Sequence, residues 1–259
     1  MLAAGGHRLE YALLEPQDAQ AVDHPTLVFL HEGLGSVALW KDFPAEVVAA
    51  TGCPALVYSR YGYGKSETLT APRSVDYMHR EALDVLPEVL DHFGVRSPIL
   101  IGHSDGASIA LVHAGSGRRL VKGVVAMAPH VFVEDITIKS IAEAKTAFQH
   151  TDLPQKLSRY HDNVVSAFGG WNDIWLHPEF RRWNIEDYLP GIVVPVLLMQ
   201  GAEDQYGTVA QIAAIARQVS GPIETIMLPG CGHSPHQSPQ KTAVIVAIAR
   251  FVAKLRESA

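Results

Sequence analysis

Apolar residues gather in short runs along the chain, and most of these runs are apolar at nearly every position rather than at alternate ones. Such runs are typical of strands that are buried on both faces, as in a parallel sheet. A separate segment, residues 7–14, has the pattern of an antiparallel edge strand. The strands that we predict to be parallel are residues 26–31, 55–59, 98–102, 123–128, 194–200 and 223–228.

Helical periodicity fills most of the intervals between these strands. We predict helices at residues 39–50, 75–93, 107–114, 209–219 and 239–256. Alternation of strand and helix along a chain indicates right-handed crossovers, with helices packed on both faces of the sheet. The sequence therefore predicts an α/β fold with a mostly parallel central sheet.

One long interval contains no convincing strand. Residues 131–190 have a helical pattern, and the segment is too long for an ordinary connection. It follows the predicted strand at 123–128, at the sheet edge where ligands bind in open α/β folds. We interpret it as a helical cap inserted into a core domain made of residues 1–130 and 191–259, although additional scaffold would give the same pattern.

The strongest chemical motif is Gly102-His103-Ser104-Asp105-Gly106, which fits G-x-S-x-G between a predicted strand and a predicted helix. In that context a tight turn holds the serine in a strained conformation and lifts its hydroxyl clear of the sheet. Ser104 is therefore the candidate nucleophile.

A serine hydroxyl needs a base, and the base needs an acid that orients it. His233 lies in a Gly-rich loop after the last predicted strand, and Asp204 lies in the equivalent loop one strand earlier. The order Ser, Asp, His along the chain is the one that accompanies this kind of turn. We predict a triad of these residues, with His236 as a rival base and Glu203 as a rival acid.

Acyl transfer also needs N–H donors for the oxyanion of its tetrahedral intermediate. The turn at residues 31–35 follows the first predicted parallel strand and contains two glycines. We assign one donor to Gly33, with Leu34 as the competing choice. The second donor is the N–H of Asp105, directly after the nucleophile.

Together these motifs resemble the α/β-hydrolase superfamily, in its branch of small capped esterases, enol-lactonases and carbon–carbon bond hydrolases. Residues 59–66 resemble the Gly-x-Gly-x-Ser turn of that family, and Ser104, Asp204 and His233 fall on its triad positions. One departure is Glu32, where many members have glycine; we expect its side chain to point to solvent or to a basic partner.

The resemblance implies a serine hydrolase that cleaves a small carboxylic ester, thioester or lactone through an acyl-enzyme. A carbon–carbon bond hydrolase of aromatic catabolism is the main alternative, because the same residues serve both reactions. A ligand-sensing protein that keeps the fold is a further alternative, since fold alone does not fix activity.

Several residues are candidates for the substrate pocket. Trp171, Trp175 and Trp183 lie in the proposed cap and indicate an apolar or aromatic substrate, although packing of the cap against the core would also need them. His31 lies at a strand end that faces the pocket. Arg60 is a candidate for binding a substrate carboxylate through two hydrogen bonds.

Charge and targeting signals narrow the choice of partners. The net charge is −6 and no block of Lys or Arg is present, which argues against nucleic acid or an acidic membrane as a partner. No apolar stretch has the length of a membrane span, and the first residues lack a signal-peptide pattern. We expect a cytoplasmic protein with a small-molecule substrate; a homodimer remains open.

Two further motifs fail. Residues 64–66 read Gly-Lys-Ser, but a phosphate-binding P-loop would need glycine where Ser59 stands. Cys231, His233 and His236 have a spacing that could hold zinc, but His233 is already needed as the base. We therefore expect no cofactor and no metal.

Overall fold

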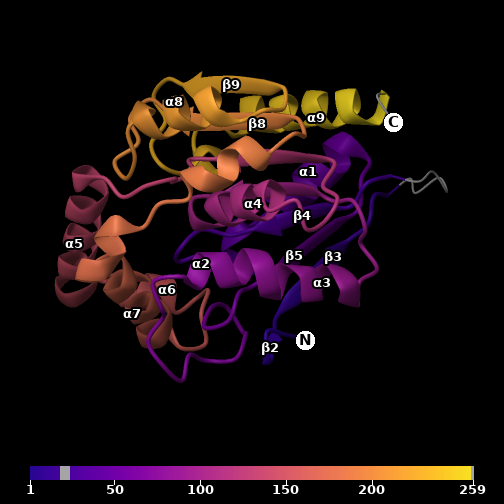
Figure 1. The fold of residues 1–259 in the computed structure, drawn as a ribbon. Helices are drawn as coiled ribbons and strands as arrows, with labels where there is room; N and C mark the ends of the chain where they lie inside the picture. The colour runs from indigo at the N-terminus through magenta and orange to yellow at the C-terminus, as the bar shows by residue number, and fades with distance from the viewer. Residues whose placement is uncertain (18–23, 258–259) are drawn as a thin grey trace.

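The computed structural model describes residues 1–17 and 24–257, and its main sheet has seven strands in the order β3-β5-β4-β6-β7-β8-β9 (Figure 1). All neighbouring pairs are parallel except β3–β5, which is antiparallel at one edge. The predicted α/β architecture is confirmed. The strands are β3 (Tyr11–Leu14), β4 (Leu27–Leu30), β5 (Ala55–Tyr58), β6 (Ile99–His103), β7 (Gly123–Met127), β8 (Val196–Gly201) and β9 (Ile223–Leu228).

Successive residues of the central strands feed two separate hydrophobic cores. In β4, Val28 and Leu30 join one core, whereas Leu27 and Phe29 join the other. Helices α1 (Phe43–Thr51) and α9 (Lys241–Glu257) contribute to the second core, and α4 (Asp105–Gly115) and α8 (Val209–Gln218) to the first. Because both faces are covered, nearly every position of these strands is apolar, which is the pattern that the sequence displays.

Two predicted helices differ in detail from the observed ones. The predicted helix at 39–50 is a short 3₁₀ turn, Ala38–Trp40, followed by α1, because Lys41 takes a positive φ of 54° between them. The predicted helix at 75–93 consists of α2 (Tyr77–Arg80), a π-helical turn (Glu81–Val85) and α3 (Leu86–His92). The outer ends of these two segments lie within two residues of the predicted ends.

The prediction of an antiparallel edge strand at 7–14 is right only for its second half. Its first half, β2 (His7–Leu9), pairs with β1 (Leu2–Ala4) in a separate two-stranded sheet, and only its second half, β3, joins the main sheet. The break falls at Glu10, whose carboxylate accepts hydrogen bonds from Ser59 Oγ at 2.7 Å and Lys65 N at 3.0 Å. These bonds hold the bend between the two strands, and sequence periodicity contains no sign of them.

The segment between β7 and β8 is helical. It contains α5 (Asp135–His150), α6 (Leu153–Leu157), α7 (Val164–Trp175) and the 3₁₀ turns Pro178–Arg182 and Glu186–Gly191. Figure 1 shows α5, α6 and α7 grouped at one side of the molecule, away from α9. Within the described chain, no helix is both long and apolar enough to cross a membrane.

Candidate active site

The candidate residues of the triad and the oxyanion turn lie together at the carboxyl edge of the sheet, in the loops that follow β4, β6, β8 and β9. The order of the strands explains the meeting. Because β4 lies beside β6, with Leu30 opposite Gly102, the turn at residues 31–35 lies next to the turn that carries Ser104. The loops after β8 and β9 bring Asp204 and His233 to the same edge.

Ser104 occupies a strained turn between β6 and α4. Its φ is 51° and its ψ is −119°, a conformation that is rare for a residue with a side chain. The backbone N–H of Ser104 donates to Met127 O at 2.9 Å on β7. A Cβ atom at Gly106 would overlap the carbonyl of Leu30, so glycine is needed there for α4 to start so close to β4. Neighbouring packing thus enforces the strain, and the serine hydroxyl faces the loops.

Three side chains form a continuous hydrogen-bonded chain. His233 Nε2 lies 2.9 Å from Ser104 Oγ, and His233 Nδ1 lies 2.9 Å from both carboxylate oxygens of Asp204. The Asp204 contact places the Nδ1 proton toward the carboxylate and leaves Nε2 as an acceptor toward the serine hydroxyl. This is the arrangement in which a neutral imidazole can remove the hydroxyl proton.

The surroundings of Asp204 keep it ionised. Burial opposes ionisation, but the hydrogen bond and charge of His233, together with the Tyr206 N–H, outweigh it and hold the Asp204 pKa below its usual value. The Tyr206 N–H donates to Asp204 Oδ1 at 2.8 Å, and the Gly207 N–H does so at 3.3 Å. The carboxylate is therefore held by two backbone N–H groups as well as by the imidazole.

The rival residues lie elsewhere. His236 is buried, and its ring packs against Trp40 and Phe43 at centroid distances of 4.7 and 5.4 Å. Glu203 is exposed, while its neighbour Asp204 contacts the imidazole. The geometry therefore favours His233 over His236 and Asp204 over Glu203.

The predicted oxyanion donors line the same pocket as Ser104. Gly33, Leu34 and Asp105 are all among its lining residues. No described residue accepts a hydrogen bond from the N–H of Gly33 or Leu34. Asp105 is the first residue of α4, where a backbone N–H has no partner within the helix. All three N–H groups are thus available to a ligand.

His31 and Arg60 do not line this pocket, so their prediction as pocket residues is wrong. Both are fully buried, and neither is among the residues that line the pocket. The Arg60 guanidinium donates to the carbonyls of His31 and Glu32, the latter at 3.1 Å, and lies 3.7 Å from Asp105 Oδ2. The Arg60 N–H donates to His31 Nε2 at 3.0 Å. Arg60 therefore joins the turn at 31–35 to Asp105, and its complete burial keeps it out of reach of a substrate carboxylate in this pocket.

Tyr77 completes this buried network. Its hydroxyl donates to Asp105 Oδ2 at 2.6 Å. Burial, followed by the charge of Arg60, lowers the pKa of His31 well below its usual value, so the imidazole is neutral. A neutral His31 can accept from the Arg60 N–H through Nε2 and donate through Nδ1 to the Glu32 carbonyl at 2.6 Å.

The pocket is small, with a volume of about 170 Å³. Trp171 and Trp175 line it, as predicted for two of the three tryptophans. Four further lining residues lie outside the motifs identified in the sequence and were not predicted from it: His130, Thr137, Ile141 and Tyr206. His130 and Tyr206 each follow a strand end by a few residues, a signal that could have found them. Thr137 and Ile141 are one turn apart on α5, and nothing in their spacing distinguishes a pocket from a core.

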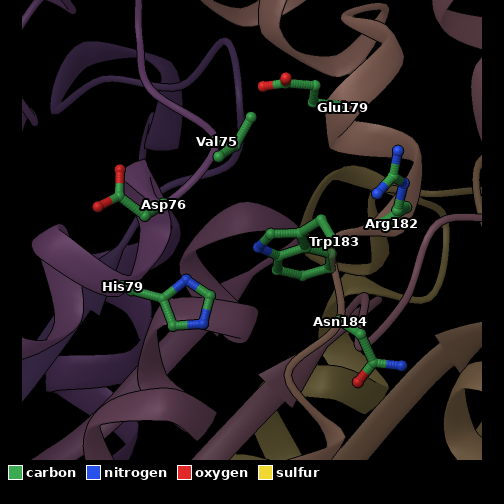
Figure 2. A pocket seen from close by; sticks show the side chains of 7 residues that line it. All are labelled: Val75, Asp76, His79, Glu179, Arg182, Trp183 and Asn184. Atoms are coloured by element: carbon green, nitrogen blue, oxygen red, sulfur yellow. The ribbon is translucent and has the colours of Figure 1, made fainter.

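Trp183 lies in a different cleft, so its prediction as a lining residue of the Ser104 pocket is wrong. Figure 2 shows it between Val75, Asp76 and His79 on one side and Arg182 and Asn184 on the other. Its ring packs in an aromatic cluster with Phe180 and Trp175, at centroid distances of 5.5 and 6.0 Å. Its role is packing in the helical segment, which was the alternative for these tryptophans.

Glu32, the departure noted in the sequence, points to a basic partner. Its Oε2 lies 3.5 Å from His103 Nδ1, and its side chain is 17% exposed. Burial would lower the pKa of His103, but the Glu32 carboxylate outweighs it and raises that pKa. The Glu32 side chain is therefore directed to His103, the kind of basic partner that the sequence predicts.

Comparison with known proteins fits this geometry. Residues 27–245 match the model of the "Alpha/beta hydrolase family". The chain belongs to the alpha/beta hydrolase family. The matched region contains the whole set of triad candidates and the segment between β7 and β8. Membership of this family agrees with the sheet order and with the strained turn at Ser104.

Individual relatives within the alpha/beta hydrolase family are distant. The acylamino-acid-releasing enzyme of Rattus norvegicus is 24% identical over 240 residues, which cover 87% of this chain but only 31% of the rat protein. Proline iminopeptidase of Mycobacterium smegmatis is similar in structure, with a TM-score of 0.75, 17% identity and coverage of 99% and 98% of the two chains. The enol-lactonase of Burkholderia xenovorans has a TM-score of 0.73, 18% identity and coverage of 97% and 99%. At such identities the structural likeness establishes the fold alone.

Proposed function

We propose that this chain is a serine hydrolase that cleaves small, uncharged carboxylic esters through an acyl-enzyme. The observation that carries the proposal is the hydrogen-bonded chain from Asp204 through His233 to Ser104. In the proposed mechanism, Ser104 Oγ attacks the ester carbonyl while His233 Nε2 takes the hydroxyl proton. His233 then gives that proton to the departing alcohol oxygen, which leaves the acyl group on the serine.

Hydrolysis of the acyl-enzyme reverses these roles. A water molecule attacks the acyl carbonyl, His233 takes its proton, and the same proton returns to Ser104 as the acid product leaves. The oxyanion in both steps accepts hydrogen bonds from Asp105 N–H and from the N–H of either Gly33 or Leu34. Asp204 stays ionised throughout and stabilises the imidazolium.

The pocket supports a small, uncharged substrate. Its volume of about 170 Å³ is below the range of about 300–1,000 Å³ that is usual for drug-sized ligands. No Lys or Arg occurs among the described residues that line it, and the only carboxylates are those of Glu32 and Asp105. A substrate carboxylate would find no lysine or arginine there. This favours a simple ester over the acidic substrates of a carbon–carbon bond hydrolase.

We also propose that residues 131–190 act as a cap over a core made of residues 1–130 and 191–259. Thr137 and Ile141 from α5, with Trp171 and Trp175 from α7, form the pocket wall that faces the loops of the sheet. The apolar faces of these helices would exclude water from the acyl group and admit a short aliphatic or aromatic chain.

The decisive experiment is labelling with a fluorophosphonate, followed by measurement of the intact mass, with a His233→Ala variant as the control. The proposal expects one adduct on Ser104 and loss of labelling in the variant. Hydrolysis of neutral short-chain p-nitrophenyl esters should then exceed hydrolysis of matched esters that carry a carboxylate. A folded protein that takes no label would contradict the proposal and favour a ligand-sensing role. Faster turnover of a vinylogous diketo acid than of any ester would favour carbon–carbon bond cleavage.

A further inference from the structure

Three metal-ligating side chains converge behind the candidate catalytic pocket. Glu32 comes from the turn after β4, His103 is the last residue of β6, and His236 lies in a 3₁₀ turn, Pro235–Gln237. One ligand atom from each residue lies within 4.8 Å of the other two. The two histidines are each only 1% exposed, so this cluster is an internal feature of the fold.

Ring nitrogens of both histidines are buried without hydrogen-bond partners. His103 Nε2 lies 2.7 Å from the carbonyl of His233, so this nitrogen carries a proton and donates it. The other nitrogen, Nδ1, is directed to Glu32 Oε2 at 3.5 Å, which is long for a hydrogen bond. Nδ1 of His103 and Nδ1 of His236 both lack partners among the described residues. Buried polar atoms rarely stay unpaired in native proteins, and such cases need an explanation.

We propose that Glu32, His103 and His236 form a binding site for one divalent transition-metal ion, with Zn²⁺ as the best fit. Two imidazoles and one carboxylate are a ligand set that Zn²⁺ commonly takes, whereas Mg²⁺ and Ca²⁺ prefer oxygen ligands. The hydrogen bond from His103 Nε2 to a backbone carbonyl is the contact that typically orients a metal-binding histidine. The site departs from the expectation, based on sequence, of a chain without metal.

The distances and the access route fit such an ion. Ligand atoms about 2.0–2.1 Å from a tetrahedral Zn²⁺ lie about 3.4 Å apart, close to the 3.5 Å between His103 and Glu32. The separations are at most 4.8 Å, so the widest needs to close by at most about 1.4 Å, a change within the rotation of a carboxylate or imidazole side chain. Glu32 and His103 also line the Ser104 pocket, so an ion can enter through it and keep a water as its fourth ligand.

This site differs from the zinc motif that the sequence alone indicates. In that motif Cys231, His233 and His236 would bind together. Both ring nitrogens of His233 contact the other triad residues, and Cys231 Sγ contacts the carbonyl of Gly232 at 3.4 Å. Only His236 of that motif takes part in the cluster, and its partners come from two distant parts of the chain.

The test is titration of chelator-treated protein with Zn²⁺, followed by native mass spectrometry and competition against a chromophoric chelator. We expect one Zn²⁺ per chain, with the ¹⁵N resonances of His103 Nδ1 and one His236 ring nitrogen shifted in imidazole-selective NMR spectra. The variants Glu32→Gln, His103→Gln and His236→Gln should each weaken Zn²⁺ binding by about tenfold or more. His130→Gln is the matched control, because His130 is also buried in the pocket wall but lies outside the cluster.

Three results would overturn the proposal. They are no stoichiometric binding by the wild-type protein, Zn²⁺-dependent shifts that fall on His233 or His130 instead, and a His236→Gln variant that binds as tightly as wild type. The NMR measurement uses the unmodified chain, so it decides the question even if a substitution in this buried cluster prevents folding.

Discussion

The indole ring of Trp171 lies directly against the backbone of Gly33, so that a Cβ atom added at Gly33 would overlap Cδ1 and Nε1 of the ring. Trp171 belongs to α7, and Gly33 belongs to the turn that we propose to hold the oxyanion. One contact therefore couples the helical segment to the N–H groups beside Ser104. The position of those groups depends on how α7 packs.

The variant Gly33→Ala should lower kcat/KM by about tenfold or more, because the new methyl group must move either Trp171 or the N–H donors. Gly33 does not have a positive φ, so alanine is compatible with its backbone and the effect is purely steric. The check is a double-mutant cycle with Trp171→Ala, measured on a short-chain ester. The loss caused by Gly33→Ala should be much smaller when Trp171 is already absent; additive losses would mean that the two residues act independently.

Asp204→Asn should lower kcat by a factor on the order of 10⁴, because an amide no longer selects the histidine tautomer that accepts the serine proton. The measurement is steady-state hydrolysis of a neutral ester, with circular dichroism to verify folding. Glu203→Gln is the matched control, since Glu203 is the exposed neighbour of Asp204 and should change the rate by less than about twofold. If the two variants lost similar activity, the acid would have to be reassigned.

Arg60→Met should reduce the free energy of unfolding by about 3–5 kcal/mol. The substitution leaves the buried Asp105 carboxylate without its positively charged partner and removes the hydrogen bonds from the guanidinium to the carbonyls of the turn at 31–35. Urea denaturation measures the change. Arg181→Met is the control: Arg181 is 46% exposed in its ion pair with Asp135, and its loss should cost less than about 1 kcal/mol.

Arg60→Met also tests the earlier interpretation of Arg60 as a substrate anchor. The ratio of rates for neutral and carboxylate-bearing esters should stay unchanged in the folded variant, since Arg60 does not reach the pocket. A selective loss of activity toward the acidic ester would restore the role in substrate binding.

Acid should destabilise the protein partly through His130. Burial, followed by the charge of His233, lowers the His130 pKa to about 3 from 6.5. Between pH 6.5 and about 3, His130 is therefore protonated in the unfolded chain but not in the folded chain. The free energy of unfolding falls as the pH is lowered through this range, and the fall ends near pH 3, where His130 of the folded protein is also protonated. In that window His130 contributes a slope of up to about 1.4 kcal/mol per pH unit.

The variant His130→Phe should remove this part of the slope, because phenylalanine takes up no proton in either state. Urea denaturation at several pH values, from about 4.5 to 8, measures the slope on both sides of the ordinary histidine pKa. The two proteins should show the same slope above that pKa and different slopes below it. Parallel curves across the whole range would mean that His130 is protonated in the folded state.

The triad candidates and the fold were predictable because their signals are local. Ser104 follows its strand directly, and Asp204 and His233 lie in the loops that follow theirs; parallel strands end at one edge of the sheet. Their relative positions follow from strand order alone. The antiparallel strand at 7–14 was predicted less well, because its break at Glu10 depends on bonds to Ser59 and Lys65.

The pocket was less predictable, and Arg60 and Trp183 show why. The sequence does not distinguish an arginine that binds a substrate carboxylate from a buried structural arginine. The packing of the loops after β4 and β5 buries Arg60 and directs its guanidinium to the carbonyls of His31 and Glu32. Trp175 and Trp183 are neighbours in the aromatic cluster, yet one lines the Ser104 pocket and the other lies in a separate cleft.

The sequence by itself determined the parallel sheet, the strained turn at Ser104 and the order of the candidate triad. Buried strands require consecutive apolar residues and tight turns require small ones, so both are visible in neighbouring positions of the sequence. Only the tertiary structure decided which side chains line the pocket, where Glu32 points and which histidines meet. Those contacts join distant parts of the chain; His103 and His236, for example, are more than a hundred positions apart. The hydrophobic periodicity of one segment carries no information about which distant segment packs against it.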